Sequence, residues 1–225
     1  MREKRITLFC GHYGSGKTNV AVNYALALKK RHERVTVADL DIVNPYFRTK
    51  DSLPLFRAME IGLIASPYAN SNLDIPALPQ EMYAVTDDRG LYAVLDVGGD
   101  DRGALALGRL TPAILEEGNY EMLAVVNRYR PLTQTVADTV EVLREVEAAA
   151  GIAFTGVVNN SNLGRETTAA DVLASLPYAE EVAKRTGLPL VMTTVEENVA
   201  KELVGKVENL FPLALQKNFI ESKIQ

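Results

Sequence analysis

Cysteine, tryptophan and excess positive charge are what this sequence has least of. Its 225 residues include one cysteine, no tryptophan and a net charge of −5. The single cysteine, Cys10, excludes a disulfide framework and a Cys-x-x-Cys metal site, and it favours a reducing cytoplasm. Acidic and basic residues are interspersed, so the sequence shows no basic face that would bind nucleic-acid phosphates. No apolar run approaches the roughly 20 residues that span a bilayer, and we expect no membrane anchor.

The composition and periodicity of the chain favour one α/β domain covering residues 1–225. Hydrophobic residues make up 47% of the sequence, which is enough for a full core. Strand-like runs alternate with helical patterns, which predicts a three-layer α/β/α fold with a mainly parallel sheet covered on both faces. We expect strands near residues 5–10, 34–39, 61–65, 91–97, 121–127, 153–159 and 189–194.

Residue spacing also predicts two helices and a loop. Apolar residues recur at helical spacing over Thr18–Lys30 and Thr133–Ala150. Residues 66–80 contain three prolines with several Asn and Ser, which favours a loop or short helices near the mouth of the sheet. Near the C-terminus, Pro212 breaks helical periodicity, so a membrane-binding amphipathic helix is not expected there.

A glycine-rich segment lies between the first expected strand and the first expected helix. It fits the pattern G-x-x-x-x-G-K-[ST] and reads Gly11-His12-Tyr13-Gly14-Ser15-Gly16-Lys17-Thr18. Glycines let the backbone aim N–H groups inward, and the helix that starts near Asn19 adds the positive end of its dipole. The pattern is that of a phosphate-binding loop for a nucleoside di- or triphosphate. We expect Lys17 to reach the β- and γ-phosphates and the Thr18 hydroxyl to ligate Mg²⁺. Asn19, directly after the loop, is also expected to bind the nucleotide.

Two carboxylates, Asp39 and Asp41, end the second expected strand. Strand periodicity places them on the same face. Next to a Mg²⁺-triphosphate, we expect Asp39 to support the metal's water shell and Asp41 to orient or deprotonate an attacking water. The alternative is a polar strand end followed by an Asn-Pro turn. The phosphate-binding loop one strand upstream favours the catalytic interpretation.

A third carboxylate, Asp96, ends another apolar strand and is followed by a loop containing Gly98 and Gly99. This pattern is typical of a Walker B element. In such an element Asp96 holds a Mg²⁺-bound water, and Gly99 brings a backbone N–H against the γ-phosphate. Asp-x-x-Gly is a weak pattern by itself, and an ordinary strand-to-loop turn is the alternative. Asp100 and Asp101 are expected to be solvated surface charges.

Amide and guanidinium groups follow two later strands. Asn159 and Asn160 end one strand, where an amide can both donate to and accept from a purine base; an Asn-rich turn is the alternative. The Asn-Lys-x-Asp sequence that specifies guanine is missing, which favours adenine. Arg128 and Arg130 follow another strand, as exposed loop residues or as ligands of a phosphate, a carboxylate or a partner's acids. The same alternatives apply to Arg48.

With these motifs, the chain resembles the SIMIBI class of phosphate-loop NTPases, and within it the MinD/ParA-like ATPases. The resemblance covers most of residues 5–200. It is carried by Gly14-Ser15-Gly16-Lys17-Thr18, by Asp39-Leu40-Asp41 with Asn44, and by Asp96 to Gly99. It implies that Lys17 and Thr18 bind phosphate and Mg²⁺. It also implies that Asp41 positions the hydrolytic water and that Asp96 supports the metal shell.

The chain departs from this family inside the phosphate-binding loop. The family's signature lysine, which reaches the partner's phosphates in a nucleotide-sandwich dimer, aligns with His12, and its next glycine aligns with Tyr13. Because an imidazole is shorter than a lysine side chain, the comparison implies a slow or differently triggered ATPase. We expect a homodimer, whose dependence on nucleotide the sequence leaves open, and a protein partner that the sequence does not identify.

The leading interpretation is a cytoplasmic ATPase that binds ATP and Mg²⁺, hydrolyses ATP slowly and acts as a molecular switch. Loops 41–52 and 97–104 would then regulate dimer or partner contacts. One alternative is a biosynthetic enzyme that activates a substrate carboxylate, because dethiobiotin synthetase and the cobyrinic acid amidases resemble the same core. Residues 66–85 with Arg128 or Arg130 would line its substrate pocket. Another alternative is a nucleotide-binding scaffold without turnover, in which Asp41 is a structural carboxylate.

Overall fold

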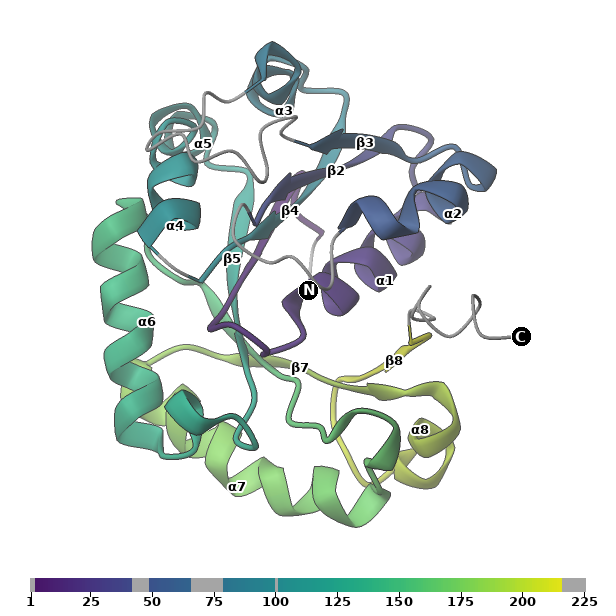
Figure 1. Cartoon of the computed structure of the whole chain (residues 1–225), viewed down its shortest axis with the longest axis vertical. Coiled ribbons are helices and arrows are strands. Elements are labelled where there is room, and N and C mark those ends of the chain that lie inside the picture. Colours follow the sequence, from purple (N-terminus) through teal and green to yellow (C-terminus); the bar gives the residue numbers. More distant parts are fainter. Residues whose placement is uncertain (1–2, 42–48, 66–78, 100, 216–225) are drawn as a thin grey trace, which may run out of the picture.

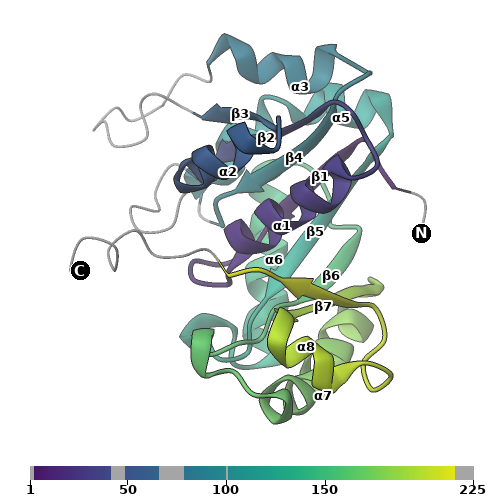
Figure 2. The ribbon, with the colours of Figure 1, turned by 90° about the vertical axis from the view of Figure 1, so that its right-hand side faces the viewer.

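The strands build one parallel sheet. The computed structural model describes residues 3–41, 49–65, 79–99 and 101–215. Within these ranges eight strands lie in the order β3-β2-β4-β1-β5-β6-β7-β8, and every neighbouring pair is parallel (Figures 1 and 2). The strands are β1 (Ile6–Cys10), β2 (Val35–Leu40), β3 (Gly62–Ala65), β4 (Tyr92–Val97), β5 (Tyr120–Val126), β6 (Gly156–Asn159), β7 (Leu190–Glu196) and β8 (Leu210–Leu213).

Helices cover both faces of this sheet, which confirms the predicted three-layer α/β/α fold. Figure 1 shows α1 and α2 on one side of the sheet and α4 and α6 on the other. The α-helices are α1 (Lys17–Lys29), α2 (Leu53–Ala58), α3 (Ala84–Asp87), α4 (Asp101–Gly108), α5 (Thr111–Glu117), α6 (Val136–Ala150), α7 (Ala169–Thr186) and α8 (Glu197–Leu203). Short 3-10 helices are η1 (Thr49–Ser52), η2 (Gln80–Tyr83), η3 (Pro131–Thr133) and η4 (Gly164–Glu166).

Each face of the sheet contributes to its own apolar core. On β1, Leu8 belongs to the cluster that also contains residues of α4 to α7, whereas Phe9 belongs to the cluster formed with α1 and α2. Successive side chains of a strand point to opposite faces, so a strand with a helix layer on both sides must be apolar throughout. This explains why the central strands read as continuous apolar runs in the sequence.

The helix predictions are correct in position and differ at their ends. The first helix begins at Lys17, one residue earlier than predicted, because Gly16 in the left-handed region closes the glycine-rich segment directly before it. The helix predicted from Thr133 begins instead at Val136. There the hydroxyl of Thr135 accepts a hydrogen bond from the backbone N–H of Asp138, a side-chain cap that fixes the start of α6.

Strand β8 was not predicted from the sequence. Pro212 lies inside it, and a proline cannot donate a ladder hydrogen bond. The strand is tolerated because β8 is at the edge of the sheet and pairs only with β7. The segment around Pro212 is therefore an edge strand, in agreement with the expectation that it is not an amphipathic helix.

Several expectations lie partly or wholly outside the described residues, including parts of loops 41–52 and 97–104. Residues 66–78 of the expected loop are among them, and the described remainder of that loop leads into η2 at Gln80. Asn44, Arg48 and Asp100 also lie outside the described ranges. In the ranges that are described, no helix is long and apolar enough to cross a membrane.

Candidate functional site

The predicted motifs meet at one edge of the sheet. All eight strands are parallel, so their carboxyl ends lie at the same edge. β1 lies between β4 and β5 in the sheet, so the segments that follow these strands flank the glycine-rich segment. The glycine-rich segment is called the P-loop below and comprises residues 11–18. The order in which the strands are added to the sheet changes direction beside β1. Open α/β sheets bind their ligands at such a point, beyond the carboxyl ends of the strands.

Glycines give the P-loop its shape. Gly14 and Gly16 have φ values of 77° and 84°, in the left-handed region that other residues rarely adopt. Within the loop, the N–H of Ser15 donates to the carbonyl of His12 at 3.0 Å. His12 Nδ1 lies 3.0 Å from the carbonyl oxygen of Tyr13, whose side chain is 56% exposed. The loop is therefore ordered by its own backbone and leaves both of the residues that depart from the family at its outer side.

Two further glycines allow the Walker B segment to pack on the P-loop. A Cβ atom on Gly99 would lie 2.1 Å from the carbonyl oxygen of Gly11, which excludes any larger residue there. A Cβ atom on Gly11 would in turn lie 2.3 Å from the carbonyl oxygen of Val125 on β5. Gly99 thus lies against the start of the P-loop, as its predicted role requires. Its contact with a γ-phosphate stays a prediction.

Lys17 is the buried cation of the site. Its side chain is 4% exposed, and Nζ donates to Asp41 Oδ2 at 2.5 Å. Burial lowers the pKa of Lys17, but the carboxylates of Asp96 and Asp41 outweigh this effect, and the net shift of the pKa is upward. Lys17 is therefore a fixed positive charge at the start of α1, held by a residue that directly follows β2.

Asp39 and Asp96 are buried neighbours on adjacent strands. They are paired in the register of β2 and β4, and Asp39 Oδ1 accepts the backbone N–H of Asp41 at 3.0 Å. Burial, followed by the charge of Asp96, raises the pKa of Asp39 to about 7. Burial also raises the pKa of Asp96, although Lys17 opposes that shift. More carboxylates than cations are buried here, so a positively charged ligand would stabilise the site.

The carboxylate of Asp96 fits a magnesium site. Its Oδ2 accepts the hydroxyl of Thr49 at 2.9 Å, and a hydrogen bond from Thr18 lowers its pKa. Its Oδ1 is buried and has no hydrogen-bond partner among the described residues. Within those residues no three His, Cys, Asp or Glu side chains are grouped to hold a metal ion. A Mg²⁺ held through Thr18 and Asp96 would accordingly take most of its oxygen ligands from phosphate and water.

The two asparagines after β6 are engaged inside the protein. Asn160 Nδ2 donates to the carbonyl of Ser15 at 2.6 Å, and its Oδ1 accepts the hydroxyl of Thr194 at 2.6 Å. Asn159 Nδ2 donates to Ser175 Oγ at 2.9 Å. Asn160 thus supports the P-loop from behind, and a Cβ atom on Gly16 would lie 2.3 Å from its Nδ2. Contact of either amide with a base stays a prediction, as does the binding role of Asn19.

The two loop arginines have different neighbours. Arg130 Nε donates to the carbonyl of Gly14 in the P-loop at 2.9 Å. Arg128 Nη1 donates to the carbonyl of Ala174 on α7 at 2.6 Å. Sequence reasoning left both roles open, and it missed Thr49 entirely. A hydroxyl residue downstream of a strand carries no pattern of its own, so no sequence signal identifies Thr49.

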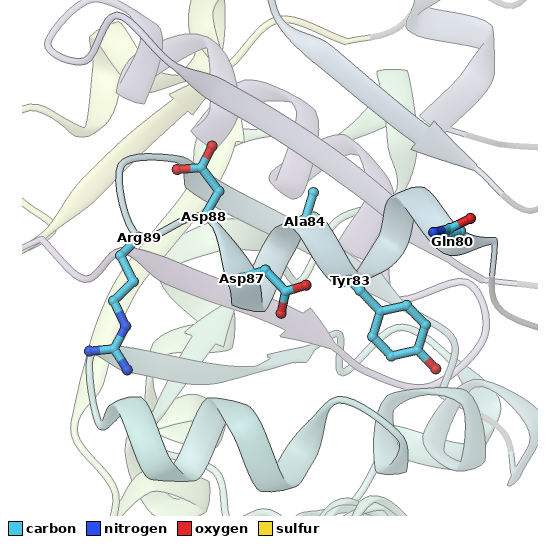
Figure 3. A pocket seen from close by; sticks show the side chains of 6 residues that line it. All are labelled: Gln80, Tyr83, Ala84, Asp87, Asp88 and Arg89. Atoms are coloured by element: carbon cyan, nitrogen blue, oxygen red, sulfur yellow. The ribbon is translucent and has the colours of Figure 1, made fainter.

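A separate hollow of about 650 Å³ lies away from the P-loop. Figure 3 shows the side chains of Tyr83, in η2, and Asp87, in α3, on the same side of the helical segment that these two elements form. The hollow is lined by Gln80, Tyr83, Ala84, Asp87, Asp88 and Arg89. Asp88 pairs with Arg34. Gln80, Tyr83 and Ala84 fall in the range 66–85 that the biosynthetic alternative assigned to a substrate pocket, but none of the lining residues is a predicted nucleotide or metal ligand. The candidate functional site is therefore the P-loop edge of the sheet and not this hollow.

Comparisons with known proteins agree on the fold. No family model and no curated protein matches the chain. It is similar to the chloroplast FtsY of Physcomitrella patens, with 17% identity over 88% of this chain and 60% of that chain and a TM-score of 0.58. It is also similar to FtsY of Mycoplasma mycoides, with 16% identity over 87% of this chain and 62% of that chain and a TM-score of 0.54.

A third similar structure is the signal recognition particle receptor FtsY of Elizabethkingia anophelis, in complex with GDP. Its identity is 14% over 97% of this chain and 62% of that chain, with a TM-score of 0.51. The chain spans 60 to 62% of the length of these receptors. At such identities the likeness is one of fold, and the narrower MinD/ParA-like assignment stays a prediction.

Proposed function

We propose that this chain, which has the fold of the SIMIBI class of phosphate-loop NTPases, is a Mg²⁺-dependent ATPase of the MinD/ParA-like type that works as a molecular switch. One observation carries the proposal: the buried Lys17 of the P-loop pairs with Asp41, beside the Asp96 oxygen that has no partner among the described residues. A Mg²⁺-nucleotide would supply a cation for Asp96 and a phosphate anion to which Lys17 could move from Asp41.

Binding of the triphosphate changes the partner of Lys17. Its ammonium would move from Asp41 to the β- and γ-phosphate oxygens, which lie within reach of the P-loop lysine in proteins of this kind. Asp41 would then be able to orient the attacking water and accept its proton at a carboxylate oxygen. The Lys17–Asp41 ion pair therefore links nucleotide binding to the segment that follows β2.

The carboxylates at the ends of β2 and β4, together with the Thr18 hydroxyl at the start of α1, would hold the metal. Thr18 and Asp96 would bind the magnesium and its waters, and Asp39 would support them from the neighbouring strand. The metal supplies neutralisation of the charge on the β- and γ-phosphates. Thr49 Oγ1 holds Asp96 at Oδ2, so loss of the nucleotide would be transmitted from Asp96 to η1.

Adenine is the proposed base. The sequence Asn159-Asn160-Ser161-Asn162 follows β6 and lacks the lysine and aspartate of the guanine-specific Asn-Lys-x-Asp motif. One similar structure is in complex with GDP, so GTP is the competing nucleotide in any test. We further propose that loops 41–52 and 97–104 change contacts with a second copy of this chain or with a protein partner.

The test is to measure nucleotide hydrolysis and oligomeric state together, with Mg-ATP and Mg-GTP. The variants are Lys17→Ala, Asp41→Ala and, as a matched control, Lys30→Ala at the exposed end of α1. We expect ATP hydrolysis by the wild type and Lys30→Ala, and a kcat/KM that is roughly 10²- to 10³-fold lower for Lys17→Ala. Asp41→Ala is expected to bind ATP and to lose roughly a hundredfold in kcat, the effect of removing a general base.

Three outcomes would contradict parts of this proposal. Preference for GTP would overturn the adenine assignment and leave the switch. Binding of ATP by a wild type that never hydrolyses it would favour a scaffold or an enzyme whose acceptor substrate is missing. An unchanged kcat in Asp41→Ala would remove Asp41 from catalysis and leave its carboxylate with a structural role.

A further inference from the structure

Arg130 lies directly on the P-loop from outside. Its Nε donates to the carbonyl of Gly14 at 2.9 Å. Its Cδ and Nε lie 3.6 Å from the position that a Cβ atom on Gly14 would occupy, and its Cζ lies 4.0 Å from the same point. The guanidinium and its stem therefore lie against Gly14.

The segment that carries Arg130 is fastened on its other side. Asn127, which is fully buried, accepts the backbone N–H of Arg130 at its carbonyl and that of Tyr129 at its side chain. Tyr129 donates its hydroxyl to the carbonyl of Asp171, and Arg128 donates to Ala174, both on α7. These hydrogen bonds fix the backbone of Arg130, so its side chain contacts the P-loop from a fixed position.

The hydrogen bond from Arg130 fixes one peptide plane of the P-loop. The peptide between Gly14 and Ser15 has its carbonyl held by Arg130 and its N–H held by the carbonyl of His12. Gly14 has a φ of 77° and no side chain, so these two hydrogen bonds, one from Arg130 and one within the loop, set the orientation of this peptide. A loop whose N–H groups are already oriented loses less conformational entropy when phosphate binds.

Arg130 also places a positive charge beside the loop. Across the described residues, no hydrogen bond reaches its two terminal nitrogens and no carboxylate pairs with it. The guanidinium therefore adds a second positive charge to the site besides Lys17, and this charge does not vary with pH near neutrality.

We infer that Arg130 is a positioning residue for nucleotide binding, because it holds the Gly14–Ser15 peptide in the phosphate-binding conformation and adds positive charge in cis. This inference rests on the proposed nucleotide-binding function. It requires no second subunit, so it predicts that Arg130 affects the affinity of the monomer for nucleotide. The sequence alone did not separate Arg130 from its neighbour Arg128.

The first experiment compares Arg130→Ala, Arg130→Lys and Arg128→Ala in the full chain. Arg128→Ala is the matched control, because it removes the same charge from the same segment but leaves the hydrogen bond to Gly14. The hydrogen bonds to Asn127 and from Tyr129 to Asp171 still hold the segment in this variant. Equilibrium titration with a fluorescent ATP analogue is expected to show roughly tenfold weaker binding for Arg130→Ala, the effect of losing one charge-assisted hydrogen bond. Arg130→Lys is expected to recover part of the loss, and Arg128→Ala to stay within about twofold of wild type.

The second experiment uses no nucleotide. Backbone amide resonances of Gly14 and Ser15 are compared by ¹⁵N NMR in the wild type and in the same variants, with thermal unfolding as a check on folding. We expect both resonances to move in Arg130→Ala and to stay in place in Arg128→Ala. A general loss of stability would move resonances throughout the chain, so the local pattern separates positioning from a merely structural role.

The outcomes of the two experiments are distinguishable. Equal nucleotide affinity in wild type and Arg130→Ala would overturn the inference and leave the proposed function intact. Equal losses in Arg130→Ala and Arg128→Ala would also overturn it, because the effect would then follow the charge of the segment and not the contact with Gly14. A wild type that binds neither ATP nor GTP would overturn the proposed function, while the amide resonances would still show whether Arg130 holds the loop.

Discussion

The two edges of the sheet each bury an ion pair, and only one of them is complete. At the amino edge, Arg5 and Glu117 form a pair whose side chains are 4% and 7% exposed. At the carboxyl edge, Lys17 and Asp41 form a pair whose side chains are 4% and 8% exposed. The burial is alike, and the difference lies in the groups that surround each pair.

At the amino edge every guanidinium nitrogen has a partner. Arg5 Nε and Nη2 donate to the Glu117 carboxylate, and Nη1 donates to the carbonyls of Asp88 and Leu91 at 3.2 and 2.8 Å. At the carboxyl edge, Asp39 and Asp96 are buried beside the Lys17 pair, and Asp96 Oδ1 receives no hydrogen bond within the described residues. The first edge is stable by itself, whereas the second is arranged to be completed by a ligand.

The largest effect is expected from breaking the complete pair. Arg5→Ala leaves the Glu117 carboxylate buried without its cation, which is expected to reduce the free energy of unfolding by about 3 to 5 kcal/mol. Urea unfolding monitored by circular dichroism measures this change. Nucleotide affinity is expected to be unchanged below the unfolding transition, and a weaker affinity there would contradict the separation of the two edges. If Arg5→Ala does not fold, Glu117→Gln tests the same pair with a neutral side chain of the same size.

Removal of Lys17 is expected to affect catalysis, whereas removal of Arg5 is expected to affect stability. Lys17→Ala should lower kcat/KM for Mg-ATP by roughly 10²- to 10³-fold, the range found when one group that stabilises transition-state charge is deleted. The reason is that no other lysine in the P-loop can reach the phosphates. Steady-state ATPase assays measure this loss, with Lys30→Ala as the control, and a kcat/KM within tenfold of wild type would contradict the role of Lys17.

Ligand binding itself distinguishes the two edges. Mg-ATP at one hundred times its dissociation constant is expected to stabilise the wild type by about 2.7 kcal/mol. The free energy of unfolding of Glu117→Gln should increase by the same amount when Mg-ATP binds, although it is lower than that of the wild type without ligand. The free energy of unfolding of Lys17→Ala should not increase. Unfolding in urea with and without Mg-ATP measures both, and stabilisation of Lys17→Ala by Mg-ATP would show that the carboxyl edge binds the nucleotide without its lysine.

Thr49 tests the connection between Asp96 and η1. Thr49→Val keeps the side-chain shape but removes the hydroxyl that Asp96 accepts, and it is expected to cost about 1 kcal/mol. We also expect a several-fold higher Mg²⁺ concentration at half-maximal ATPase activity. Thr49→Ser keeps the hydroxyl and is the matched control. Equal Mg²⁺ titrations for Thr49→Val and the wild type would show that Thr49 does not orient Asp96.

The smallest expected effect is a dependence on pH at the amino edge. The hydrogen bond from Arg5 holds the pKa of Glu117 below its usual value of 4.5. A carboxyl group whose pKa is lower in the folded state than in the unfolded state stabilises the folded protein above its unfolded-state pKa. This contribution disappears as the pH falls through the folded-state pKa. The difference in unfolding free energy between wild type and Glu117→Gln should therefore decrease below about pH 4.5. A difference that stays constant with pH would contradict this assignment.

The sequence by itself determined the fold class and which carboxylates and P-loop residues gather at the carboxyl edge. Alternating apolar runs required a covered parallel sheet, and the fixed positions of the P-loop pattern placed Lys17 and Thr18 at the start of a helix. Asp39 and Asp96 were identified because each ends an apolar strand. Each of these features is formed by residues that are close together in the sequence, so sequence motifs and local periodicity are enough to predict it.

Only the tertiary structure decided which distant residues support that chemistry. The Gly14–Arg130 and Thr49–Asp96 bonds, the bond from Asn160 to Ser15, and the pairing of β8 with β7 all join separate elements. An arginine or a threonine in a loop has no period and many possible partners, so its contact is fixed only when the sheet brings the strand ends together. For the same reason, Pro212 became compatible with a strand only once packing had placed that strand at the edge of the sheet.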